Sequence, residues 1–122
     1  MAKDDYDVIV YRVLVYLYGC MKRKIIFEDV TFQAAVRKNV ESDEYFADVL
    51  RMMQAEGLIE GLVFTKAWGG DVIIASDMKD AKITPHGIRY LTDNAKMKLI
   101  GETLKESVDI IAKLANTLML FA

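Results

Sequence analysis

The sequence predicts a small α+β domain that is mostly helical, and three observations lead to this fold class. The 122 residues are 53% hydrophobic and 28% charged, with one proline, so the chain can bury a core and is not typical of disorder. Apolar residues recur at helical spacing in several segments that follow capping residues. Alternating and branched residues on both sides of a Gly-Gly turn predict one β-hairpin.

The first predicted helix covers residues 5–21, directly after Asp4 and Asp5, which can cap it. Its many branched and aromatic residues would also suit a strand, but its length favours a helix because strands are rarely so long. The segment is apolar on nearly every side, which indicates burial of more than one face. One face can meet the domain's own core, and the other needs a C-terminal helix or a second subunit.

The middle of the chain contains a weak second helix, a clear third helix and the hairpin. Residues 25–27 are a candidate short strand, and residues 28–38 are the weak helix. Ser42 caps the third helix, whose stripe of apolar residues at helical spacing is Phe46, Val49, Leu50 and Met53. The hairpin follows over 58–66 and 72–75, with its turn at 68–71.

Two more helices complete the predicted fold. Thr84 and Pro85 begin a short helix that Asn94 can end, and a last long helix is expected from Lys96 to Leu120. The resulting order is that of a winged helix-turn-helix with a two- to three-stranded wing and a long C-terminal helix. We expect the winged-helix domain to cover residues 1–95 and the C-terminal helix residues 96–122, in one structural domain overall.

Several segments also follow one another in an order known from a family. They are Ser-Asp-Glu-Tyr-Phe at 42–46, Met-Met-Gln-Ala-Glu-Gly-Leu-Ile at 52–59 and Ile-Thr-Pro-His-Gly-Ile-Arg-Tyr-Leu at 83–91. In these the chain resembles the YjcQ-like proteins, small winged-helix proteins of Gram-positive bacteria and their phages. The resemblance covers residues 40–111 in register and residues 1–39 in outline. It implies a winged-helix fold in a superfamily that binds nucleic acid, but no particular ligand and no catalytic residue.

Composition limits the function classes. The net charge of −2 argues mildly against binding to nucleic acid, because phosphate contacts need basic residues. Cys20 is the only cysteine, so no disulfide forms within the chain. The first apolar run follows acidic residues, contains Arg12 and is too short to cross a bilayer, so we expect a cytoplasmic protein without membrane contact.

Catalysis and metal binding find little support in the sequence. No motif places a nucleophile beside His86, the only histidine, which we interpret as a surface residue. One histidine and one cysteine are too few for a structural zinc site, and Gly69-Gly70 is a hairpin turn rather than a phosphate-binding loop. We expect a non-enzymatic protein without cofactor or metal.

The first functional hypothesis is DNA recognition. The third helix would enter the major groove, where Arg51 and Gln54 would contact guanine and adenine. Phosphate contacts would come from the basic residues Lys22, Arg23, Lys24, Arg37, Lys38, Lys66 and Lys79. The objection is charge, because residues 41–56 contain five acids and one base, and Glu44 and Asp48 on the outward face would repel phosphates.

The last helix carries a heptad pattern of apolar residues, here called the C-terminal seam, formed by Leu104, Val108, Ile111, Ala115, Leu118 and Phe121. The seam can pack on the first helix or on a second copy. We expect a homodimer, because the two long helices have more apolar surface than one small domain can hide. A dimeric DNA-binding protein of the transcriptional-regulator type is therefore the first interpretation, and it rests on the fold alone.

The alternative is a winged-helix module, which a phage could encode, that binds another protein instead of DNA. It would use the acidic third helix or Trp68, which lies at the tip of the wing. Trp68 can touch a groove or a protein partner, and it can equally fold back onto the domain. The charge of the third helix favours this alternative, whereas the fold and the expected dimer favour DNA.

Overall fold

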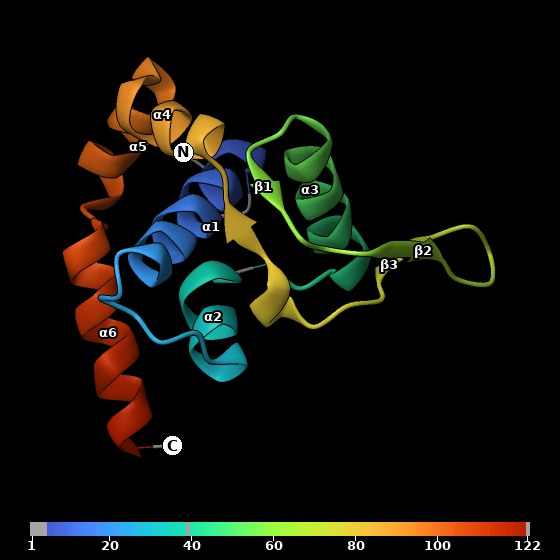
Figure 1. The fold of residues 1–122 in the computed structure, drawn as a ribbon, viewed down its shortest axis with the longest axis horizontal. Helices are drawn as coiled ribbons and strands as arrows, with labels where there is room; N and C mark the ends of the chain where they lie inside the picture. Colours follow the sequence, from blue (N-terminus) through green and yellow to red (C-terminus); the bar gives the residue numbers. More distant parts are fainter. Residues whose placement is uncertain (1–4, 39, 122) are drawn as a thin grey trace.

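The computed structural model describes residues 5–38 and 40–121, with side chains up to Thr117, and shows a mostly helical α+β fold (Figure 1). The helices are α1 (Tyr6–Met21), α2 (Asp29–Val36), α3 (Asp43–Ala55), α4 (Pro85–Asp93), α5 (Ala95–Leu104) and α6 (Val108–Phe121). The strands are β1 (Ile59–Glu60), β2 (Phe64–Lys66), β3 (Val72–Ile74) and β4 (Lys82–Ile83), and a short 3-10 turn, η1, covers Met78–Asp80.

Helix α1 is the centre of the molecule. The other helices and β4 all pack on it, and α6 runs beside α1 and α2 (Figure 1). Every residue from Val8 to Leu17 is buried, including Arg12. The prediction that this helix buries more than one face is therefore confirmed, and the covering elements come from the same chain.

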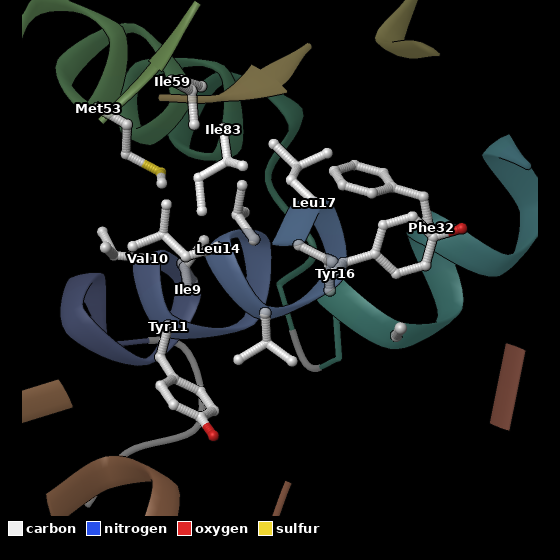
Figure 2. Close-up of a cluster of buried hydrophobic side chains, with 14 of the residues drawn as sticks. Ile9, Val10, Tyr11, Leu14, Tyr16, Leu17, Phe32, Met53, Ile59 and Ile83 are labelled. Carbon is white, nitrogen blue, oxygen red and sulfur yellow. The ribbon is translucent and has the colours of Figure 1, made fainter. Parts of the chain in front are cut away.

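An aromatic cluster joins α1 to α2 and α3. The Tyr16 ring meets the Phe32 ring edge to face, with the ring centroids 5.2 Å apart (Figure 2). Tyr16 also meets Phe27 edge to face at 5.6 Å, and Phe32 reaches Phe46 at 6.3 Å. The buried Tyr16 hydroxyl lies 2.7 Å from the Thr31 hydroxyl, so its polar end has a hydrogen bond. Edge-to-face rings add to the stabilisation from burial, and they hold α2 and α3 at fixed positions on α1.

The predicted helix starts at Ser42 and Thr84 are confirmed, and so is the predicted end of a helix at Asn94. The Ser42 hydroxyl accepts a hydrogen bond from the Tyr45 amide, and the Thr84 hydroxyl accepts one from the Gly87 amide. The Asn94 side chain accepts from two amides of α5, so this residue both ends α4 and caps the next helix. Each cap satisfies amides that have no partner within the helix, typically worth about 1 kcal/mol.

The described strands form two separate antiparallel pairs. Strand β1 pairs with β4, with Ile59 opposite Ile83, and β2 pairs with β3, with Thr65 opposite Ile73. A hairpin is present where it was predicted, and its tip projects away from the helices (Figure 1). Its first strand is shorter than predicted, because only Phe64–Lys66 of residues 58–66 pairs with β3, whereas Ile59–Glu60 pairs with β4 instead. Within the described residues no third strand joins this hairpin. Residues 25–27 are not a strand, because they form a loop whose Ile25 side chain is buried against Gly19.

The expected long C-terminal helix is wrong, because the chain forms α5 and α6 with a break between them. Lys105 adopts a left-handed conformation with φ of 55°, and α6 starts again at Val108. The sequence around the break contains no proline, but Ser107 caps α6, because its hydroxyl accepts a hydrogen bond from the Ile110 amide at 3.3 Å. Glu106, in the break itself, is held by Arg12 and Tyr11 of α1 and by Lys38, which follows α2. The second helix is also shorter than predicted, at Asp29–Val36.

Candidate interaction surface

Helix α3 and the β2–β3 hairpin lie against each other and form the surface that sequence reasoning singled out. The apolar stripe of α3 is buried as predicted. The hairpin places Val72 and Ile74 half-buried next to α3, and it leaves Ile73 exposed on its outer face. The hairpin is thus fixed to α3 along one face while the other face meets solvent.

Gln54 fastens the start of the hairpin to α3. Its Nε2 donates to the Leu62 carbonyl at 2.8 Å, and the Leu62 amide donates to its Oε1 at 3.0 Å. Leu62 itself is buried. Both polar ends of the Gln54 amide are therefore used within the protein, and contact with an adenine would require these two bonds to be given up. Arg51 stays exposed, 3.8 Å from the Asp48 carboxylate.

Three of the seven cations expected to contact phosphates are paired with carboxylates of the protein. Lys24 lies 2.7 Å from Asp109, and Lys38 lies 3.1 Å from Glu106. Arg37 lies 2.7 Å from Asp43 and also covers the Phe46 ring, 5.0 Å from its centroid. The remaining members are Lys22, which covers the Tyr18 ring, Arg23 in the loop after α1, and the exposed Lys66 and Lys79.

These cations do not gather on one side of the molecule. The end of α1, which precedes Lys22–Lys24, lies beside α6, whereas the hairpin with Lys66 projects on the other side (Figure 1). The acids are closer together, since Glu41, Asp43 and Glu44 are all exposed at the start of α3. The structure thus brings the acidic residues of this surface together and separates the basic ones.

Apolar side chains are exposed next to this acidic helix. Trp68 is fully exposed at the tip of the hairpin, so it does not fold back onto the domain. Val63 and Ile73 are exposed on the outer face of the hairpin. A groove of about 340 Å³ runs between α2, α3 and β3 and is lined by Gln33, Arg37, Asp43, Glu44, Phe46, Ala47, Val72, Ile73, Ile74 and Met78.

The described part of the C-terminal seam faces its own chain. Ile111 and Ala115 are buried, and Leu104 and Val108 are half-buried against the same core. The Leu118 and Phe121 side chains lie outside the described residues. A second copy therefore could not use Ile111 or Ala115 without α6 first leaving α1.

Sequence reasoning missed a buried ion-pair network at the α5–α6 break. Arg12 of α1 lies 3.1 Å from the Glu106 carboxylate, which also pairs with Lys38. The Tyr11 hydroxyl donates to the Glu106 carbonyl. Burial alone would raise the pKa of Glu106, but the hydrogen bonds and charges of Arg12 and Lys38 outweigh it and hold the pKa below its usual value. An arginine inside an apolar helix was the available signal, since a buried charge needs an opposite charge.

Other candidate chemistry is sparse among the described residues. His86 is exposed at the start of α4, and within residues 5–38 and 40–121 no three side chains of histidine, cysteine, aspartate or glutamate come close enough to hold a metal ion. Burial raises the pKa of the Cys20 thiol to about 11, which disfavours the reactive thiolate near neutral pH. None of the described helices is long and apolar enough to span a membrane.

Comparison with known proteins places the chain in a family. Neither the curated proteins nor the solved structures include a match. A family model described as YjcQ protein matches residues 11–110, which includes the region of the sequence resemblance except its last residue and extends it toward the amino terminus. The matched range contains most of α1, the α3–hairpin surface and the Glu106 network, so the chain belongs to the YjcQ family.

Proposed function

We propose that this protein is a non-enzymatic winged-helix interaction module whose α3–hairpin surface binds a basic protein segment that also carries apolar side chains. In this interpretation α2 and α3 form the helix-turn-helix and the β2–β3 hairpin forms the wing. The order of these elements and the packing of β3 on α3 support it. The choice of a protein partner over DNA rests on the chemistry of the exposed side chains.

One observation carries the proposal: the fully exposed Trp68 lies on a hairpin that is fixed to an acidic helix. Tryptophan is enriched at the centres of protein interfaces, and Val63 and Ile73 are exposed nearer the base of the same hairpin. Glu41 and the acids of α3 would attract a basic partner and repel phosphates. The partner we expect is therefore a lysine- or arginine-rich segment with apolar anchors.

DNA binding by a dimer is the second candidate. Exposed Arg51 on α3 favours it, as do Lys66 and Lys79 on the hairpin side, since these three could reach a duplex without breaking an internal ion pair of the core. It is weaker because Gln54 is already used and because Lys24, Arg37 and Lys38 are paired with carboxylates. A Lys66→Ala variant therefore tests phosphate contact more directly than a variant of Lys38 would, because Lys38 is already paired with Glu106.

Trp68 allows a direct test because it is the only tryptophan, so its fluorescence reports on the hairpin alone. A short peptide of alternating leucine and lysine should shift the emission to shorter wavelength and bind more weakly as salt is added. Glu44→Gln and Asp48→Asn should each weaken the binding, and Glu102→Gln on α5 serves as a charge-matched control.

Random-sequence duplex DNA is titrated in the same way, beside Arg51→Ala and Lys66→Ala. The proposal predicts no salt-dependent binding of the duplex. Binding of the duplex with a salt slope that becomes shallower in Lys66→Ala would overturn it in favour of DNA. Equal binding of the peptide by the wild type and the acid variants would show that the acids of α3 do not select the partner.

A further inference from the structure

A second cavity lies away from the α3–hairpin surface, at the carboxyl end of α1. It has a volume of about 430 Å³, within the usual range of roughly 300–1,000 Å³ for small-molecule sites. The last turn of α1, the loop that follows and β4 enclose it. Its lining consists of Leu17, Cys20, Met21, Arg23, Ile25, Ile26, Phe27, Ala81, Lys82 and Ile83.

The cavity has apolar walls and two positively charged residues in its lining. Leu17, Ile25 and Ile83 are buried apolar residues, whereas Met21 and Ile26 are exposed large apolar residues. The charged residues that line the cavity are Arg23 and Lys82, and none of the described residues that line it is acidic. An apolar hollow whose charges are all positive is complementary to a molecule with an apolar body and one negative group.

The backbone holds Arg23 in an unusual position. Arg23 adopts a left-handed conformation with φ of 64°, while the Lys24 and Ile25 amides both donate to the Gly19 carbonyl, at 2.9 and 3.2 Å. Glycine is usual where a helix ends in this way, because a side chain adds steric strain. This chain nevertheless has arginine there, so the helix end carries a guanidinium group beside the cavity at some cost in stability.

Lys82 is held at the other side of the cavity. Its Nζ donates to the Lys79 carbonyl at 2.9 Å, which limits the movement of the ammonium group. Its charge reaches the Cys20 thiol inside the cavity, where it acts to lower the thiol pKa against the larger effect of burial. Lys82 and Cys20 both line the cavity, so the lysine contributes positive charge to its wall.

We propose that this cavity binds a small organic anion free in solution, with its apolar body between Leu17, Ile25 and Ile83 and its acidic group on Arg23 and Lys82. The expected class is an aromatic or short aliphatic carboxylate, sulfonate or phosphate ester. The inference does not depend on the proposed function, since none of the residues involved belongs to the α3–hairpin surface. Occupancy would stiffen the contact between α1 and β4.

Anilinonaphthalene sulfonate has this chemistry, and its fluorescence rises when it enters an apolar site, so it is the probe. The wild type should bind it, and Arg23→Gln and Lys82→Gln should each raise the Kd by about tenfold through loss of a charged contact. Lys113→Gln, on the exposed side of α6, is the charge-matched control and should bind like the wild type. Trp68→Ala excludes binding at the hairpin and should also leave the Kd unchanged.

Two further measurements separate the possible outcomes. Naphthalene sulfonate should displace the probe more strongly than the uncharged naphthyl methanol, and it should slow the reaction of Cys20, the only thiol, with dithiodipyridine. Far-UV circular dichroism checks that each variant is folded. Equal Kd values for wild type, Arg23→Gln and Lys82→Gln, or an unchanged Cys20 rate at saturating ligand, would overturn the proposal. Binding of the protein to anionic phospholipid vesicles with no effect of naphthalene sulfonate would assign the two cations to a membrane surface instead.

Discussion

Replacing Glu106 by glutamine tests whether the buried ion-pair network fixes the α5–α6 break. Arg12 is 3% exposed and Glu106 13% exposed, so the exchange removes a negative charge that faces a guanidinium in a largely dry site. Breaking a buried pair typically costs about 3–5 kcal/mol, and we expect about 2–3 kcal/mol because Lys38 on the other side is partly open to water. For a chain of this size that is a fall in Tm of roughly 8–12 °C.

The neighbouring pair between Lys24 and Asp109 provides a matched control. The distance between Lys24 Nζ and the Asp109 carboxylate is 2.7 Å, shorter than the 3.1 Å between Arg12 and Glu106, but the Lys24 and Asp109 side chains are 44% and 77% exposed. Exposed pairs contribute little because water screens them, so Asp109→Asn should unfold at the same urea concentration as the wild type. Urea titration followed by circular dichroism measures both variants. A Glu106→Gln protein as stable as Asp109→Asn would refute the assignment of the break to this network.

The pH dependence gives a second check on the same carboxylate. The pKa of Glu106 is lower in the folded protein than in the unfolded chain, because Arg12 and Lys38 favour its ionised form. Its contribution to stability is therefore complete above the unfolded value of about 4.3 and is lost as the pH falls through the lower folded value. The difference in unfolding free energy between wild type and Glu106→Gln should shrink below about pH 4.3.

Three further changes test single contacts of the fold. Gln54→Ala should cost about 1–3 kcal/mol in urea titrations, because it leaves the buried Leu62 backbone without its hydrogen bonds, and hydrogen exchange of the Leu62 amide should become faster. Lys105→Gly should raise the free energy of unfolding in urea by up to about 1 kcal/mol, since glycine adopts the left-handed conformation without steric strain, and a lower free energy of unfolding would contradict this. Ile111→Asp should destabilise each molecule without changing its mass in light scattering, whereas a halved mass would show that the C-terminal seam joins two copies.

Features that depend on neighbouring residues could be predicted from the sequence. The caps at Ser42, Thr84 and Asn94 form within three residues, so the identity of a few side chains decides them. The buried stripe of α3 and the β2–β3 hairpin also follow from periodicity and turn residues. The order of most helices could therefore be derived before any tertiary contact was known.

Features that depend on distant residues could not be predicted. Strand β1 pairs with β4 because Ile59 and Ile83 close over α1, a contact that no local pattern encodes. The C-terminal segment contains no proline, so a single long helix was expected. The ion pair between Glu106 in the break and the distant Arg12 could not be read from a local pattern, whereas Ser107, which caps α6, was a local signal of the break.

The charges of the candidate site also include some that the sequence shows directly and others that depend on distant residues. The excess of acids in α3 can be counted in the sequence, because it needs only the composition of one helix. Whether a given lysine or arginine is available to a ligand depends on its partners, and Lys38 meets the largely buried Glu106 carboxylate just before α6, whereas the pair between Lys24 and Asp109 is exposed and weak. A phosphate backbone would have to compete with Glu106 for Lys38, whereas a basic protein segment would meet Glu41 and Glu44, which are exposed. The folding of the C-terminal segment onto α1 and α2 therefore weakens the case for DNA at Lys38, and this supports the proposal that the acidic helix and Trp68 recognise a protein.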